Sequence, residues 1–121
     1  MVVEIKKTAV YSVSDDMVIT VKVGEGKIGS STVMFKPPDP DAFTKTLAIG
    51  KIKNKSIGKG SGYRGGKLII ETMISSLLPS NNLVSVDYEI TGGSWNTVRP
   101  YFREEDIVGS TVVTILEVDL L

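Results

Sequence analysis

The chain contains no cysteine and no histidine. Without cysteine it can form no disulfide framework, no thiolate nucleophile and no thiolate metal site. Without histidine it lacks the commonest general base, the usual partner of a serine nucleophile and the commonest metal ligand. We therefore expect a protein that is not an enzyme and that uses no metal and no cofactor.

The chain also lacks an excess of either charge and any long apolar run. Lys and Arg number 14, Asp and Glu number 14, and 41% of the 121 residues are hydrophobic. This composition is typical of a folded chain, and the length suits one domain spanning residues 1–121. No run approaches the roughly 18 apolar residues of a membrane span. Lys6 and Lys7 follow only a few apolar residues, unlike a secretory signal, so we expect a cytoplasmic protein.

Hydrophobic residues recur mainly with a period of two, which is typical of strands with one buried face. Short connections between such strands favour antiparallel pairing, because parallel pairing needs long crossovers. The sequence therefore predicts an all-β fold, a single-domain antiparallel β-sandwich of jelly-roll type with seven or eight strands. A small β-barrel is the alternative. The clearest expected strands are residues 3–13, 17–23, 32–36, 68–75, 84–90, 95–102 and 110–121.

Two hairpins are expected within this set. Ser14–Asp16 and Pro79–Asn82 are turn signals, each lying between two alternating segments. Lys7 interrupts the apolar face of the first segment, which indicates an edge position or a bulge. The apolar faces expected in the second hairpin are formed by Leu68, Ile70, Thr72 and Ile74 and by Val84, Val86, Tyr88 and Ile90.

Three segments are less regular. Residues 39–50 fit a short helix that begins near Asp39, or a strand in which Leu47 and Ile49 alternate. Residues 53–66 hold five glycines and predict a long mobile loop. Gly24–Gly29 matches a dinucleotide-binding pattern by letter, but the strand-like residues that follow favour a simple loop over 24–31. Trp95 fits a core position or an exposed contact beside Arg99 and Tyr101.

Charge is unevenly placed along the chain. Residues 42–70 contain seven cations and no acid, so this span carries +7 and the rest carries −7. Lysines at 51, 53 and 55 would point one way on a strand, where they either protect a sheet edge from aggregation or bind an anionic partner. The candidate anion- or partner-binding residues are Lys51, Lys53, Lys55, Lys59, Arg64 and Lys67.

An acidic protein face is the partner that this pattern favours. Nucleic acid is disfavoured because the net charge is zero and only Tyr63 supplies an aromatic ring within residues 51–67, which hold the candidate cations. A membrane surface is less favoured than a protein. The chain carries acids of its own in expected turns, so copies could stack head to tail into a homo-oligomer, or these acids could bind Ca²⁺. They are Asp15, Asp16, Asp39, Asp41, Glu104, Glu105 and Asp106.

Together these observations favour a non-catalytic structural or protein-interaction module, a subunit or adaptor within a larger assembly. The alternative is a module that binds an anionic ligand, such as a lipid headgroup, a polyanion or an acidic glycan. Reversing the charge of Lys51, Lys53 and Lys55 separates these functions from edge protection.

Overall fold

The computed structural model describes residues 2–25, 27–75, 83–104 and 111–121. These residues form eight strands and one short 3₁₀ helix, η1 (Gly60–Gly62), with no α-helix among them. The strands are β1 (Val2–Val23), β2 (Ile28–Lys36), β3 (Lys45–Gly50), β4 (Lys55–Lys59), β5 (Lys67–Ser75), β6 (Val84–Trp95), β7 (Tyr101–Glu104) and β8 (Thr111–Leu120).

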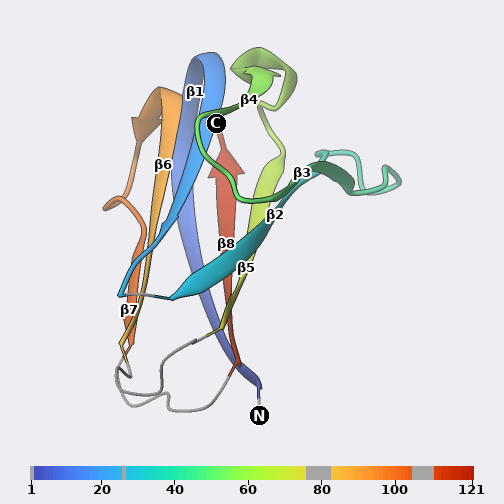
Figure 1. The fold of residues 1–121 in the computed structure, drawn as a ribbon. Coiled ribbons are helices and arrows are strands. Elements are labelled where there is room, and N and C mark those ends of the chain that lie inside the picture. Colours follow the sequence, from blue (N-terminus) through green and yellow to red (C-terminus); the bar gives the residue numbers. More distant parts are fainter. Residues whose placement is uncertain (1, 26, 76–82, 105–110) are drawn as a thin grey trace.

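The strands join into one open, sandwich-like sheet, which confirms the all-β fold (Figure 1). The order is β3-β2-β5-β8-β1-β6-β7, and β4 pairs with β1 outside that path. Every pair is antiparallel except β1 with β8, the first and last strands. A parallel pair needs a long connection. Here that connection is everything between the two strands, so no crossover helix is required.

The first expected hairpin is wrong, because its two segments form a single bent strand. Residues 2–11 of β1 pair with β8, whereas Val18–Val23 pair with β6. Between them the chain folds over at the top of the molecule, where the register with β6 shifts (Figure 1). At the bend, Asp15 Oδ1 accepts the Asp16 N–H at 2.8 Å. The turn residues therefore form a bend within one strand, not a reversal that pairs neighbouring segments.

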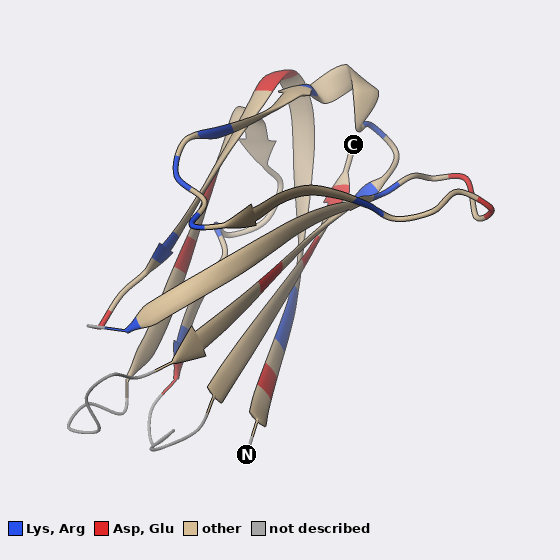
Figure 2. Cartoon of the chain, turned by 45° about the vertical axis from the view of Figure 1, so that its right-hand side comes forward, with Lys and Arg blue, Asp and Glu red and all other residues tan. Residues whose placement is uncertain are grey.

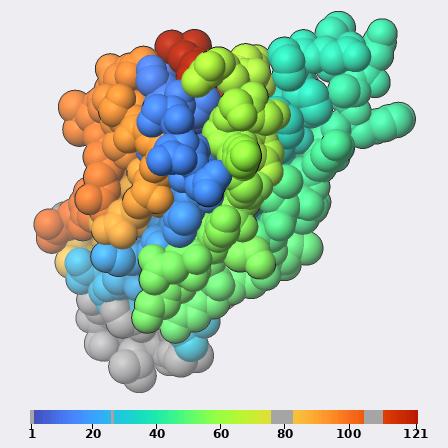
Figure 3. Space-filling view, turned by 90° about the horizontal axis from the view of Figure 1, so that it is seen from above, coloured from blue at the N-terminus to red at the C-terminus, as the bar shows by residue number. Residues whose placement is uncertain are grey.

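Strand β6 bends together with β1. Gly93–Trp95 pair with Tyr11–Val13 below the bend, and residues 86–91 pair with the second half of β1. Viewed from above, β1 runs between β6 on one side and the β4–η1 segment on the other (Figure 3). Since β1 is an interior strand, Lys7 marks no edge, and its Nζ instead donates to the Tyr101 carbonyl at 2.7 Å.

The second expected hairpin is also wrong. β5 pairs with β2 and β8, and β6 pairs with β1 and β7, so the two strands do not pair with each other. The Pro79–Asn82 turn lies outside the described residues. Alternation reveals which face of a strand is buried, but it does not reveal which strand lies beside it.

The predicted buried faces are confirmed. Leu68, Ile70 and Ile74 of β5 are fully buried, as are Val86 and Tyr88 of β6. The buried hydrophobic side chains form one cluster between the layers. Trp95 is half-buried: it packs against this cluster, with its ring 4.9 Å from that of Tyr11, and it also borders a shallow surface hollow together with Arg99.

A chain of hydroxyl groups crosses this core. Tyr88 from β6 bonds Thr114 of β8 at 2.8 Å and approaches Thr72 of β5 at 3.4 Å. Thr72 in turn bonds Ser31 of β2 at 2.8 Å. All four residues are buried, so each hydroxyl satisfies another and none is left without a partner.

Of the three less regular segments, one is a predicted strand and two differ from expectation. Residues 39–50 contain β3 and a turn around Asp39, so the strand interpretation is confirmed. Residues 53–66 are not a free loop, because β4 pairs with β1 and Gly60 lies so close to β1 that a Cβ there would be 2.8 Å from the Asp15 carbonyl. The loop expected over 24–31 is shorter, since β2 begins at Ile28. Among the described residues of this loop, Glu25 is the one with a positive φ.

Candidate anion- or partner-binding surface

The candidate lysines lie on the connection from β3 to β4 and on β4 itself. Lys51 and Lys53 belong to a loop, while Lys55 and Lys59 are the first and last residues of β4. The expectation that positions 51, 53 and 55 share one strand is therefore wrong. The strand is broken by positive φ values at Gly50 (111°) and Asn54 (48°).

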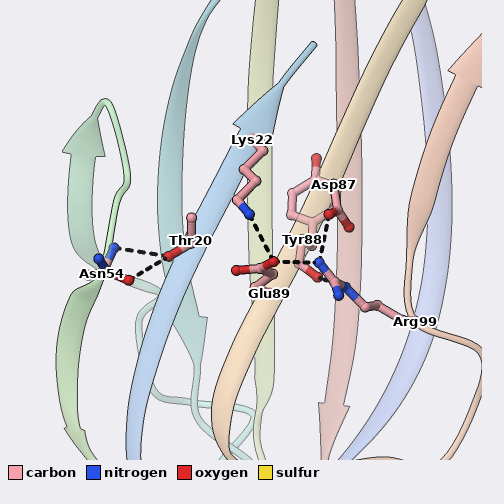
Figure 4. Close-up of polar contacts among 7 residues, drawn as sticks. All are labelled: Thr20, Lys22, Asn54, Asp87, Tyr88, Glu89 and Arg99. Carbon is pink, nitrogen blue, oxygen red and sulfur yellow. Dashed lines mark hydrogen bonds and ion pairs between the residues drawn. The ribbon is translucent and has the colours of Figure 1, made fainter.

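The loop is nonetheless anchored to the body of the protein. Ile52 is only 3% exposed, and its carbonyl accepts the Val21 N–H at 2.9 Å. Two residues later, the Asn54 N–H donates to Thr20 Oγ1 at 2.9 Å, and the Thr20 hydroxyl returns a bond to Asn54 Oδ1 at 3.3 Å (Figure 4). With Ile52 inserted in the core, Lys51 and Lys53 extend to solvent on either side of it.

Four of the six candidate residues form neither an ion pair nor a side-chain hydrogen bond with any other described residue. Lys51, Lys53 and Lys55 are exposed, and within the described residues none of them lies in an ion pair or donates a side-chain hydrogen bond. Lys59 is also exposed and forms no ion pair among the described residues. It lies opposite Asp16 in the ladder between β4 and β1, and it shares a shallow hollow with Asp15 and Asp16. These nearby carboxylates offset part of its charge.

The other two candidates are occupied within their own chain. Arg64 donates to the Val13 carbonyl at 2.8 Å and so ties the turn after η1 to β1. Lys67 at the start of β5 lies 3.4 Å from Glu117 and 3.9 Å from Asp119. The structure therefore separates Lys51, Lys53 and Lys55 from two cations whose contacts hold the fold.

The structure also contains a groove that was not expected from the sequence. It lies between β3 and the β4–η1 segment and has a volume of about 590 Å³. Its walls include Lys45 and Leu47 from β3, Lys59 from β4, and the aromatic side chains of Phe35 and Tyr63. The only signal in the sequence was Tyr63, a single ring within a run of glycines.

Asp39, Asp41 and Glu89 are acidic residues that lie outside the loop between β3 and β4. The tip of the connection between β2 and β3 is acidic, whereas basic positions recur from β3 through β4 (Figure 2). On the neighbouring surface, Lys22 and Arg99 contact Glu89 at 3.0 and 2.8 Å (Figure 4). These hydrogen bonds lower the pKa of the Glu89 carboxyl, so it stays ionised and is a poor general acid.

The turn acids do not assemble into a metal site among the residues that can be described. No three Asp or Glu side chains come together there. Asp39 already accepts the Asp41 N–H through its own carboxylate at 2.9 Å. Glu105 and Asp106 fall outside the described residues.

Comparison with known proteins adds no relative. No protein-family model, no curated protein and no solved structure matches the chain. Among the described residues, no helix is long and apolar enough to cross a membrane.

Proposed function

We propose that this protein is a non-catalytic interaction module that holds an acidic partner protein on the loop between β3 and β4. The observation that carries the proposal is the state of Lys51 and Lys53, which are exposed and unpaired among the described residues, on a loop fixed by buried Ile52. An anchored loop presents its charges with little further loss of conformational freedom on binding. Unpaired lysines contribute little to the fold itself.

The test uses a Glu-rich polypeptide of about 20 residues as the acidic probe, with binding followed by fluorescence anisotropy. Reversal of both loop charges, Lys51→Glu with Lys53→Glu, is expected to weaken binding about tenfold or more, because each attraction becomes a repulsion of similar size. Raising the ionic strength from 0.05 to 0.5 M should weaken the wild-type complex in the same direction.

The matched control reverses two exposed cations elsewhere, Lys36→Glu with Arg103→Glu. It changes the net charge by the same amount and should retain binding close to that of the wild type. Equal losses in both double variants would reduce the effect to net charge and contradict the proposal.

Two further probes separate the competing functions. Heparin and vesicles containing phosphatidylserine present polyanions and lipid headgroups to the same loop. If either binds through Lys51 and Lys53 while the Glu-rich probe does not, the anionic-ligand module replaces the proposal. If no probe binds, the proposal is wrong.

A further inference from the structure

We infer that the acidic partner binds as an extended segment that adds one antiparallel strand to the free edge of β3. This inference rests on the proposed function and names how the partner is held. Its premise is that β3 ends the sheet, pairing with β2 alone. Outside that ladder, no described backbone hydrogen bond involves residues 45–50. The outward N–H and C=O groups of β3 are therefore open for pairing.

The edge of β4, which also borders the groove, is partly covered. The Tyr63 hydroxyl donates to the Ile57 carbonyl, which lies in the middle of β4. The Tyr63 ring also stacks edge-on against Phe35 of β2, with ring centres 4.9 Å apart. A strand approaching β4 would have to displace this side chain. Of the two edges that border the groove, β3 is the accessible one.

The side chains around β3 fit an extended peptide that carries both apolar and acidic residues. Ile49 on the strand is 73% exposed and Phe43, just before it, is 90% exposed. Leu47 lines the groove. The register of β3 with β2 shifts at Leu47, so the groove-lining Leu47 and the exposed Ile49 are two separate apolar contacts for a bound segment. An added strand matching the six residues of β3 would be about 20 Å long.

Charge identifies the occupant as acidic and argues against a second copy of β3. Lys45 begins the strand and Lys51 directly follows it. If two copies of β3 paired antiparallel about a two-fold axis, Lys45 of each would lie beside Lys51 of the other. Like charges placed across a strand pair are destabilising. A strand carrying Glu or Asp would instead place opposite charges at both ends.

The experiment uses a seven-residue peptide of alternating Glu and Val, blocked at both termini. It is compared with two versions N-methylated at alternate residues, one at every Glu and one at every Val. On an added antiparallel strand, the N–H groups of only one alternate set face the host. One methylated peptide should therefore lose binding at least tenfold, while the other binds much like the parent peptide.

Amide hydrogen exchange provides the readout on the protein. Binding of the parent peptide should slow exchange of outward-facing amides within residues 45–50 about tenfold or more, with little change in β8. The inference is overturned if the peptide binds in a manner dependent on Lys51 and Lys53 but both methylated versions bind equally and β3 gains no protection. That result would leave the proposed function standing. If neither the peptide nor the Glu-rich probe binds, both fail.

Discussion

The hydroxyl of Tyr88 on β6 reaches across the core to two other strands. It bonds Thr114 of β8 and approaches Thr72 of β5, and all three side chains are fully buried. We expect Tyr88→Phe to lower the free energy of unfolding by about 1–3 kcal/mol, because a buried threonine hydroxyl loses its partner. Urea denaturation at pH 7 measures this loss. Tyr101→Phe, at an exposed position, is the control and should change stability little.

The same side chain makes stability depend on alkaline pH. Burial raises the pKa of Tyr88, and burial also raises that of Tyr11. Unfolded tyrosine titrates near pH 10, so above that pH the unfolded chain loses protons that the folded chain keeps. The stabilising contribution is complete below about pH 10 and is lost as the pH rises through the folded pKa. Denaturation curves between pH 8 and 11 should show the decline, and Tyr88→Phe should make it less steep.

Among the elements, the paired bend of β1 and β6 is the one most sensitive to a single methyl group. A Cβ at Gly93 would lie 2.0 Å from the Ser12 carbonyl, so β6 could not approach β1 at the corner. We expect Gly93→Ala to destabilise the fold by more than about 1 kcal/mol. Thermal and urea denaturation test this. Gly62→Ala, where nothing lies within 4 Å of the added carbon, should change stability far less.

The elements also show how far the sequence could predict the fold. Alternation in β5 and β6 correctly identified Leu68 and Tyr88 as buried, because a half-exposed strand imposes a period of two. The strand partners could not be predicted in this way. Every strand has two edges, and which strand pairs with each edge depends on the arrangement of the whole sheet.

β4 and the lysine loop show the same limit at the candidate site. Residues 55–59 contain a single large apolar side chain, Ile57, and the strand is defined by backbone pairing with β1. The charge of the basic span was visible in the sequence. The sequence did not show that Arg64 and Lys67 are engaged while the loop lysines are free. The partners of Arg64 and Lys67 come from β1 and β8, which are distant in the sequence.

For the molecule as a whole, fold and proposed binding should be separable. Lys51 and Lys53 contribute no ion pair among the described residues, so the double reversal to Glu should change the free energy of unfolding by no more than about 0.5 kcal/mol. Urea denaturation of the binding variant and its charge-matched control should give overlapping transitions. A large loss of stability in the loop variant alone would mean that these lysines support the fold.

The parallel pairing of β1 with β8 gives the molecule a direction in which it resists tension. The strands run side by side through ten registered pairs, from Val2 with Thr111 to Tyr11 with Leu120. The N-terminus lies at one end of this ladder and the C-terminus at the other (Figure 1). A force pulling the two termini apart would slide the strands along each other and load all the ladder bonds together. Separation could not proceed by opening one bond after another, so a mechanical load on this chain would be carried by the middle of the sheet.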